Sequence, residues 1–202
     1  CIRDRVIIMG FRNDLELISS WIKPNSTVLD LGCGDGYLLK MLAEKKNIKG
    51  LGVDNDINKI KLALKKNVNV LQLDLDTGLE TFNTQSFDYV VLAQSLQVVK
   101  NPDKLIKEML NIGEEIIVSF PNMGHWRPRL QLFFKGMMPV TDALPFKWFS
   151  TPNIHLCTIS DFISFCEEHN LRISQRVIVN KNQKSSLLIK LFPNLFGAVS
   201  YT

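Results

Sequence analysis

Residues 28–36 read VLDLGCGDG, and this stretch decides the fold. A short apolar run passes into glycines at positions 32, 34 and 36, and the apolar spacing of residues 37–42 then begins a helix. The pattern predicts a buried strand, a glycine turn and a helix whose N-terminus points into the turn. Glycine lets the backbone adopt positive φ and approach a ligand closely, and the first N–H groups of the helix are free to donate. We therefore expect a small polar ligand at this turn.

The two acids beside the glycines, Asp30 and Asp35, restrict which ligand fits. The dinucleotide fingerprint is G-x-G-x-x-G, whereas this turn has the tighter spacing G-x-G-x-G. Carboxylates repel a pyrophosphate at short range and attract a cation. S-adenosylmethionine (SAM) carries an ammonium and a sulfonium and has no phosphate, so it suits the turn. The alternative is a tight turn whose glycines are only structural.

Two further acids follow the next two predicted strands. Asp54 ends the strand 51–54, about 20 residues after the glycines, where doubly wound folds place an acid that binds ribose hydroxyls. Asp74 ends the strand 68–74, in a position to accept from an adenine amino group. A single acid after a strand is more often a helix cap. Acids at three successive strand ends around a glycine turn resemble the class I SAM-dependent methyltransferases.

This resemblance implies a fold and a site. The fold is α/β, with a doubly wound, mainly parallel, seven-stranded sheet that ends in an antiparallel C-terminal hairpin, as in Rossmann-like class I methyltransferases. The implied ligand is SAM or its product S-adenosylhomocysteine. The implied binding residues are Asp30, Gly32, Cys33, Gly34, Asp35, Gly36, Asp54, Asn55, Asp74, Leu75 and Gln94.

Helices and strands alternate along most of the chain, which favours a parallel sheet with helices on both faces. We expect helices at residues 13–22, 37–46, 57–66, 102–110 and 158–169, and strands at residues 28–31, 51–54, 68–74, 87–93, 116–120, 171–179 and 198–202. Residues 187–195 fit a short strand, helix or loop. Thr158 and Asp161 have the spacing of a capping box.

The composition fits one globular domain over residues 1–202 and argues against several other classes of protein. The net charge is +4, but the lysines are spread over helical faces, so we expect no nucleic-acid partner. The four cysteines and three histidines form no metal-ligand pattern, so we expect no metal and a reducing, cytoplasmic location. No apolar run approaches the about 18 residues that a membrane span requires. Because the sequence opens with Cys1, Met9 is a candidate native start.

The alternation breaks at residues 122–157, which we interpret as a lid or insert because compact domains rarely contain so long a connection. The segment is rich in aromatic residues, and four of its side chains are candidate contacts: Trp126, Arg127, Arg129 and Trp148. They suit an anionic or planar acceptor, with arginine as a bidentate clamp. They equally suit a partner interface, where Trp and Arg are common anchors. A third interpretation is that they pack the segment onto the sheet.

Several long strings resemble one family, the methionine biosynthesis protein MetW family. They are SFPNMGHWRPRLQL at residues 119–132, MPVT at 138–141 and TPNIHLCT at 151–158, together with LGCGDG at 31–36 and QSLQ at 94–97. The resemblance covers residues 13–172. It implies a protein of the methionine pathway that works beside the homoserine O-acyltransferase.

The sequence also bears on catalysis. In similar small-molecule methyltransferases the fourth strand leads to a Leu-Glu-His-Val-x-x-Pro stretch, whose histidine lies near the acceptor. Here residues 96–102 read LQVVKNP, and Val98 occupies the histidine position and cannot take a proton. His125 and His155 are weak candidates for the missing base, and either is more often a packed, hydrogen-bonded residue.

Two functions follow from these observations. The first is a SAM-dependent methyltransferase that acts on an unknown small molecule, for which proximity to an activated sulfonium supplies most of the catalysis. The alternative is a non-catalytic subunit that senses SAM and regulates the homoserine O-acyltransferase.

Overall fold

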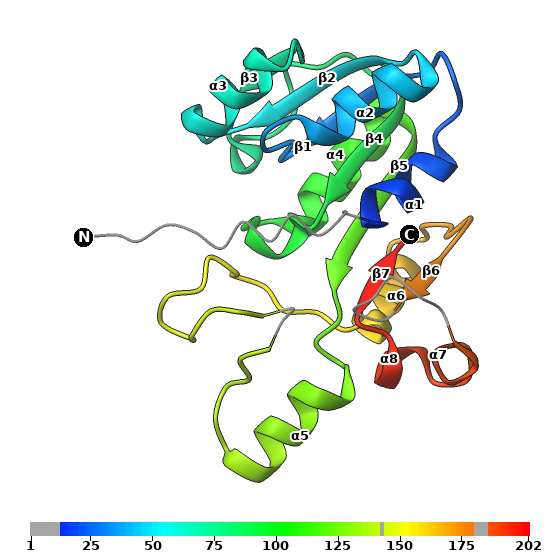
Figure 1. Ribbon diagram of the computed structural model, residues 1–202. Coiled ribbons are helices and arrows are strands. Elements are labelled where there is room, and N and C mark those ends of the chain that lie inside the picture. The colour runs from blue at the N-terminus through cyan, green and yellow to red at the C-terminus, as the bar shows by residue number, and fades with distance from the viewer. Residues whose placement is uncertain (1–12, 142–143, 180–185) are drawn as a thin grey trace.

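The computed structural model describes residues 13–141, 144–179 and 186–202, and Met9 lies outside them. One seven-stranded sheet, in the order β3-β2-β1-β4-β5-β7-β6, runs through the molecule (Figure 1). The strands are β1 (Thr27–Leu31), β2 (Lys49–Asp54), β3 (Val70–Gln72), β4 (Phe87–Ala93), β5 (Gly113–Pro121), β6 (Val177–Val179) and β7 (Val199–Tyr201). All neighbouring pairs are parallel except β5–β7 and β6–β7. The predicted doubly wound sheet with an antiparallel C-terminal hairpin is confirmed.

Helices cover both faces of this sheet. The helices of the described residues are α1 (Asn13–Trp21), α2 (Tyr37–Lys46), α3 (Ile57–Lys65), α4 (Pro102–Ile112), α5 (Trp126–Lys135), α6 (Ile159–Glu168), α7 (Leu187–Leu191) and α8 (Pro193–Phe196), of which α5 lies apart from the sheet. The capping box of α6 is present, since the Thr158 hydroxyl accepts from the Asp161 N–H and the Asp161 carboxylate accepts from the Thr158 N–H. Single 3₁₀ turns lie at Leu75–Thr77 and Leu96–Val98.

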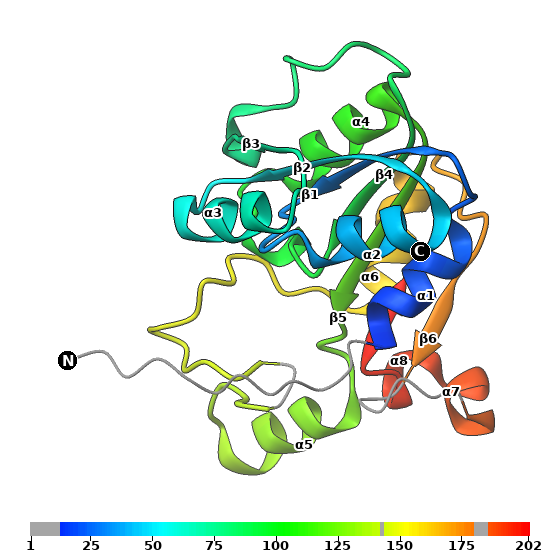
Figure 2. The same ribbon diagram turned by 45° about the horizontal axis from the view of Figure 1, so that its top comes forward.

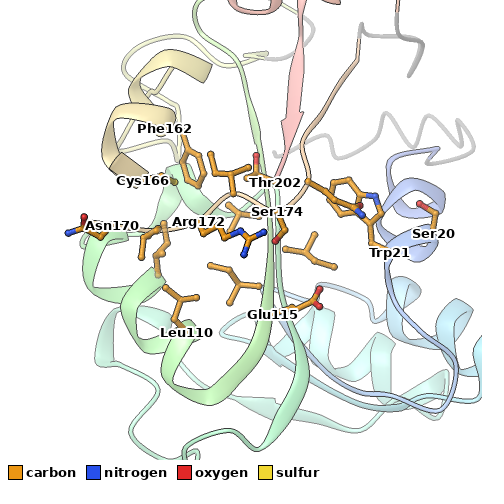
Figure 3. A pocket seen from close by; sticks show the side chains of 17 residues that line it. Ser20, Trp21, Leu110, Glu115, Phe162, Cys166, Asn170, Arg172, Ser174 and Thr202 are labelled. Atoms are coloured by element: carbon orange, nitrogen blue, oxygen red, sulfur yellow. The ribbon is translucent and has the colours of Figure 1, made fainter. Parts of the chain in front are cut away.

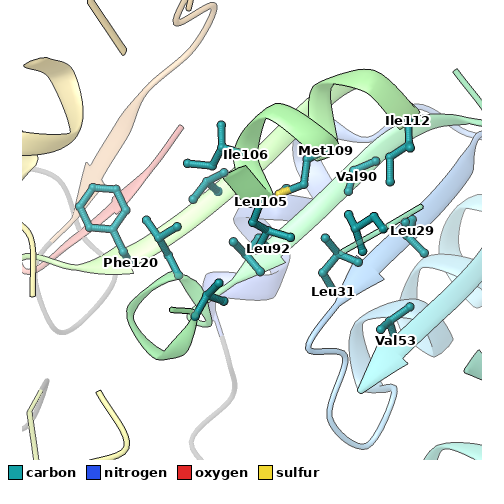
Figure 4. Close-up of a cluster of buried hydrophobic side chains, with 14 of the residues drawn as sticks. Leu29, Leu31, Val53, Val90, Leu92, Leu105, Ile106, Met109, Ile112 and Phe120 are labelled. Carbon is teal, nitrogen blue, oxygen red and sulfur yellow. The ribbon is translucent and has the colours of Figure 1, made fainter. Parts of the chain in front are cut away.

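The central strands are apolar on both faces, and their alternation divides the core in two. Val28, Tyr89 and Val91 point to the side covered by α1, α2 and α3. Leu29 and Leu92 point to the other side, where α4 and α6 cover them (Figure 4). Helix α4 contributes Leu105, Ile106, Met109 and Ile112, which share one helical face. This two-sided core holds the carboxyl ends of β1, β2 and β4 at one edge of the sheet.

One predicted strand is shorter than expected, one open alternative is decided, and one helix was not predicted. The strand expected at 171–179 covers only Val177–Val179. β7 pairs with β6 through three residues only, and residues 171–176 pair with no strand of the described structure. Of the strand, helix or loop considered for residues 187–195, the structure shows helices, namely α7 and α8. The segment 122–157 contains a helix, α5, which the sequence analysis did not predict.

A buried amide fixes the point where β5 ends and the 122–157 segment begins. The Asn122 side chain is 3% exposed, and its Nδ2 donates to the carbonyls of Asn194 and Gly197. Its Oδ1 accepts from the N–H groups of Gly124 and Ile159. One side chain therefore joins β5, α6 and the α8–β7 connection. Its amide nitrogen donates two hydrogen bonds and its amide oxygen accepts two, which is the full capacity of an asparagine side chain.

We expect Asn122→Ala to lower the free energy of unfolding by about 3 kcal/mol, because it leaves buried backbone groups without partners. Urea unfolding at pH 7 measures the effect. Asn83→Ala is the control, since Asn83 is exposed and makes only backbone contacts. Equal midpoints for the two variants would contradict this role for Asn122.

Candidate functional site

The glycine turn lies between β1 and α2, and all three of its glycines have positive φ. The φ angles are 72° at Gly32, 58° at Gly34 and 72° at Gly36, and Gly36 is the N-cap of α2. The N–H groups of Gly32 and Cys33 both donate to the Val53 carbonyl, at 2.8 and 2.9 Å. The turn is therefore held against the end of β2, and its conformation favours glycine at each of the three positions.

The three glycines differ in what surrounds them. A Cβ on Gly32 would lie 2.6 Å from the Ser95 hydroxyl oxygen, and a Cβ on Gly36 would lie 3.1 Å from Ala63 and Val68. Gly32 and Gly36 thus permit close packing within the protein. A Cβ on Gly34 would meet no atom within 4 Å, so the backbone here borders open space. Of the three glycines, Gly34 is therefore the one that leaves room for a ligand to approach the turn.

The carboxylate of Asp54 connects the glycine turn to the β2–α3 connection. Its Oδ2 accepts from the Gly34 N–H and its Oδ1 accepts from the Asp56 N–H, both at 2.9 Å. The side chain is only 6% exposed. Each carboxylate oxygen accepts more than one hydrogen bond, so capacity remains for a ligand's hydroxyl groups.

A cavity of about 160 Å³ lies beside Asp54. Its lining residues are Gly32, Asp54, Asn55, Lys59, Leu73, Asp74, Leu75, Asp76, Ser95, Val98 and Val99. Five of these, namely Gly32, Asp54, Asn55, Asp74 and Leu75, were predicted from the sequence. Ligand pockets usually measure roughly 300–1,000 Å³, so this cavity has room for only part of a drug-sized or nucleoside-sized ligand. Its three carboxylates disfavour a diphosphate and suit hydroxyl, amino and cationic groups.

The other predicted ligand residues do not line this cavity. Asp30 is 3% exposed in β1, and Cys33 is 8% exposed, with its thiol against Gly52. Burial, together with the carboxylates of Asp30 and Asp54, raises the pKa of Cys33 to about 12, so its thiol is neutral. Asp35 accepts from the Tyr37 N–H at the start of α2, and Lys66 forms an ion pair with it.

Gln94 lies at the end of β4 with φ 57°, and its N–H donates to the Ser119 carbonyl. Its carbonyl accepts from the Gln97 side chain. Gln94 therefore shapes the connection after β4, whose next residues include the cavity-lining Ser95, Val98 and Val99.

Sequence reasoning missed several lining residues. Lys59 is one of the lysines that the sequence analysis placed on helical faces, and Asp76, in the turn after β3, was not singled out. The Asp76 carboxylate accepts from the Lys100 N–H at 2.7 Å and so connects two walls of the cavity. The spacing D-x-D at residues 74–76 was the available signal for it.

The two candidate bases both have structural roles. His155 Nε2 donates to the Lys100 carbonyl at 3.0 Å, and its backbone N–H donates to the Gln97 carbonyl. His125 is the N-cap of α5, and its Nδ1 accepts from the Arg127 N–H at 3.2 Å. Burial, together with the Arg127 guanidinium, lowers the pKa of His125. Neither histidine lines the cavity.

The four predicted acceptor or partner contacts also lie away from the cavity. The Arg127 guanidinium lies 5.4 Å from the Trp126 ring centroid, and Arg129 Nε donates to the Gly124 carbonyl. Trp148 is 74% exposed and meets Phe149 edge to face. These side chains are presented to solvent by the 122–157 segment.

A larger cavity, about 570 Å³, lies elsewhere, between α1, α4, α6 and β5 (Figure 3). Trp21, Leu110, Phe162 and Arg172 are among its lining residues, and none of the glycines of the turn borders it. It lies beside residues 171–176, where the expected strand is absent. We assign the site to the smaller cavity because Gly32 of the turn and three carboxylates line it, and one of these, Asp54, accepts from the Gly34 N–H.

A comparison with family models identifies residues 12–201 as methionine biosynthesis protein MetW. The chain belongs to the MetW family. Within the described ranges, no helix of this MetW-family chain is long and apolar enough to cross a membrane. The same ranges contain no group of three or more His, Cys, Asp or Glu side chains placed to hold a metal ion.

Two curated relatives illustrate what the chain is similar to. It is 32% identical over 191 residues to the bifunctional methionine biosynthesis protein MetXA/MetW of Rhodopirellula baltica, across 90% of this chain and 31% of that protein. It is also 32% identical over 116 residues to N-methyltransferase 4 of Papaver somniferum, across 54% of this chain and 32% of that protein. The chain thus spans about a third of the length of each relative.

Solved structures share the fold. A SAM-dependent methyltransferase of Mesorhizobium loti matches with a TM-score of 0.66 at 15% identity, over 94% of both chains. Phosphoethanolamine N-methyltransferase 2 of Haemonchus contortus, in complex with S-adenosylhomocysteine, matches with a TM-score of 0.64 at 18% identity, over 85% of this chain and 39% of that one. At these identities the likeness establishes the Rossmann-like methyltransferase fold.

We expect Cys33 to resist alkylation in the folded protein, because the thiolate is the nucleophile and the raised pKa keeps the thiol protonated at pH 8. Iodoacetamide treatment at pH 8, followed by peptide mass spectrometry, measures this. The same cysteine in urea-unfolded protein is the control and should be alkylated fully. Complete labelling of folded Cys33 at the unfolded rate would contradict its burial.

We expect His125→Ala to destabilise the protein by about 1 kcal/mol through loss of the α5 cap, and His125→Asn to preserve it. The lowered pKa adds a pH dependence. The unfolded chain binds a proton near pH 6.5 and the folded one resists it, so this contribution to stability is present above that pH and declines below it. Urea unfolding at pH 7.5 and 5.5 tests both points. The same pH response in wild type and His125→Asn would contradict the titration of this cap.

Proposed function

We propose that this chain binds SAM, or S-adenosylhomocysteine, at the glycine turn. The open space at Gly34, the buried carboxylate of Asp54 and the acidic cavity beside it support this assignment. Asp54 and Asn55 would hold the ribose, Asp74 and Leu75 the adenine, and the turn from Asp30 to Gly36 the amino-acid portion. When bound, SAM supplies an electrophilic methyl group on a sulfonium.

We expect Asp54→Ala to weaken SAM binding by about 1.5–3 kcal/mol, since it removes hydrogen bonds to a charged group and releases the Gly34 N–H. Isothermal titration calorimetry with SAM and with S-adenosylhomocysteine measures the change. Asp103→Ala is the control, because Asp103 is an exposed acid in the first turn of α4. Unchanged binding in Asp54→Ala would show that the ribose lies elsewhere.

The function that these features support best is that of a SAM-binding partner of the homoserine O-acyltransferase. The main support is the Rhodopirellula baltica relative, which by its name joins MetXA and MetW activities in one chain. Among the described residues, no histidine lines the cavity, and Val98 stands where related methyltransferases carry one. SAM is a downstream product of methionine, so a SAM site without a base suits a subunit that reports its level.

The structure contains a physical connection between the cavity and the 122–157 segment. The N–H groups of Ile154 and His155 both donate to the Gln97 carbonyl, next to the cavity-lining Val98 and Val99. His155 also donates to the Lys100 carbonyl, and the Lys100 N–H donates to Asp76 in the cavity. A ligand that shifts Asp76 or the connection after β4 would thus shift the segment that carries the exposed aromatic residues.

Linkage gives this function a direct test. If SAM changes the affinity for the acyltransferase by some factor, the acyltransferase must change the affinity for SAM by the same factor. We expect a change of at least fivefold in each direction, measured by calorimetry with purified homoserine O-acyltransferase of the same organism. Asp54→Ala, which lacks the ribose contact, should lose the effect. Identical acyltransferase affinity with and without SAM would remove the regulatory function.

Methyl transfer is the second candidate, favoured by the similarity to N-methyltransferase 4 of Papaver somniferum. Proximity and an in-line approach account for much of such catalysis, so an acceptor that is already deprotonated needs no base from the protein. Incubation with methyl-labelled SAM and a pool of methionine-pathway metabolites tests it. Transfer of label to a metabolite would support this candidate, and retention of all label in SAM would exclude it for that pool.

A further inference from the structure

Helix α5 and the residues just after it carry large apolar side chains that are exposed in the described structure. Trp126, Leu130, Phe133 and Phe134 have the spacing of one helical face, and Met137 follows just after the C-cap Gly136. We call these five residues the α5 surface. Phe133 is 82% exposed and Phe134 is 75% exposed. Within α5, all of which is described, only Pro128 is buried.

The position of α5 explains this exposure. Figures 1 and 2 both show the helix projecting beyond the carboxyl end of β5, apart from the helices that cover the sheet. The chain that leaves α5 folds back along it, where the Val140 N–H donates to the Gln131 side chain at 3.2 Å. Trp148 and Phe149 form a further exposed aromatic pair on the same segment. Monomeric proteins rarely expose large apolar side chains in such groups unless they bind something.

The charge around the α5 surface is one-sided. Between residues 116 and 160 the sequence has four cationic side chains, Arg127, Arg129, Lys135 and Lys147, and a single acid, Asp142, which lies outside the described residues. The Lys147 ammonium lies 5.8 Å from the Phe149 ring centroid. A complementary partner is therefore apolar at its centre and carries carboxylates around it.

We propose that the α5 surface docks the homoserine O-acyltransferase, on an apolar face of that enzyme rimmed by Asp and Glu side chains. This inference rests on the proposed partnership and adds the surface that mediates it. The family match spans α5, and the Rhodopirellula baltica relative, aligned over 90% of this chain, by its name joins MetXA and MetW in one polypeptide. Aromatic residues, Met and Arg are enriched at protein interfaces, and Asp and Glu are depleted, as in this segment.

Two other occupants fit less well. A second copy of the α5 surface would bring like cations together, which opposes self-association. An anionic membrane would satisfy the charge, but the fused relative provides no reason for a membrane and a direct reason for an acyltransferase.

The test compares two double variants that each place two aspartates on an exposed helix face. Phe133→Asp with Phe134→Asp changes the α5 surface, and Leu62→Asp with Leu64→Asp changes α3, where the two leucines are 49% and 55% exposed. Binding to purified homoserine O-acyltransferase is measured by biolayer interferometry, and SAM binding by calorimetry. We expect the α5 variant to bind the acyltransferase at least tenfold more weakly and SAM normally, and the α3 variant to bind both normally.

Lys135→Glu tests the charge complementarity separately. We expect it to slow association with the acyltransferase several-fold at low salt, and the difference from wild type to shrink at 0.5 M NaCl. An unchanged association rate at low salt would overturn the acidic rim of the proposed partner face.

The outcomes separate the claim that the α5 surface is the docking site from the claim that the acyltransferase is the partner. Normal acyltransferase binding by the α5 variant would overturn this surface and leave the proposed partnership in place. No binding by wild type would overturn both. If wild type cosediments with vesicles of phosphatidylglycerol and phosphatidylcholine and the α5 variant does not, the α5 surface binds a membrane and the proposed acyltransferase docking is overturned. If wild type forms a dimer in analytical ultracentrifugation and the α5 variant does not, the α5 surface binds a second copy of the chain and the proposed acyltransferase docking is overturned.

Discussion

The carboxylate of Asp54 is the interaction on which the candidate site depends. It ends β2, and its two oxygens accept from the Gly34 N–H and the Asp56 N–H. It thereby joins the glycine turn after β1 to the end of the neighbouring strand by a side-chain hydrogen bond. Because the charge is 6% exposed and hydrogen-bonded on both oxygens, it orders the turn and remains able to accept from a ligand. The parallel pairing of β1 with β2 brings these two strand ends together.

The sequence predicted the parts of the fold that depend on local pattern. Strands buried on both faces and the amphipathic α4 left clear apolar spacings, and the capping box of α6 followed from Thr158 and Asp161. Residues 171–176 were less predictable, because a strand forms only where a ladder partner exists and β7 pairs with three residues of β6. Helix α5 was missed because its apolar residues were interpreted as lid contacts and its N-cap is a histidine.

The candidate site was predictable only in part, for a related reason. Asp54 and Asp74 were found because parallel strand ends meet at one edge of a sheet. Lys59 and Asp76 reach the same cavity from a helix and a turn; the D-x-D spacing at residues 74–76 was the one signal for Asp76, and no motif marked Lys59. The roles of His125 and His155 could not be predicted from the sequence, since a histidine can cap a helix, donate to a backbone carbonyl or act as a base. The hydrogen bonds in the structure show that His125 caps α5 and that His155 holds the connection after β4.

The molecule has two chemically different regions, a cavity lined by carboxylates at the strand ends and an apolar, cationic surface on α5. Hydrogen bonds through Asp76, Lys100, His155 and Gln97 lie between them. The most direct measurement of the central claim is a crystal structure of the protein grown with S-adenosylhomocysteine. We predict the ribose hydroxyls within hydrogen-bonding distance of Asp54 and the amino-acid portion beside Gly34. A nucleoside bound in the larger cavity beside Phe162, or Asp54 turned away from the ligand, would contradict it.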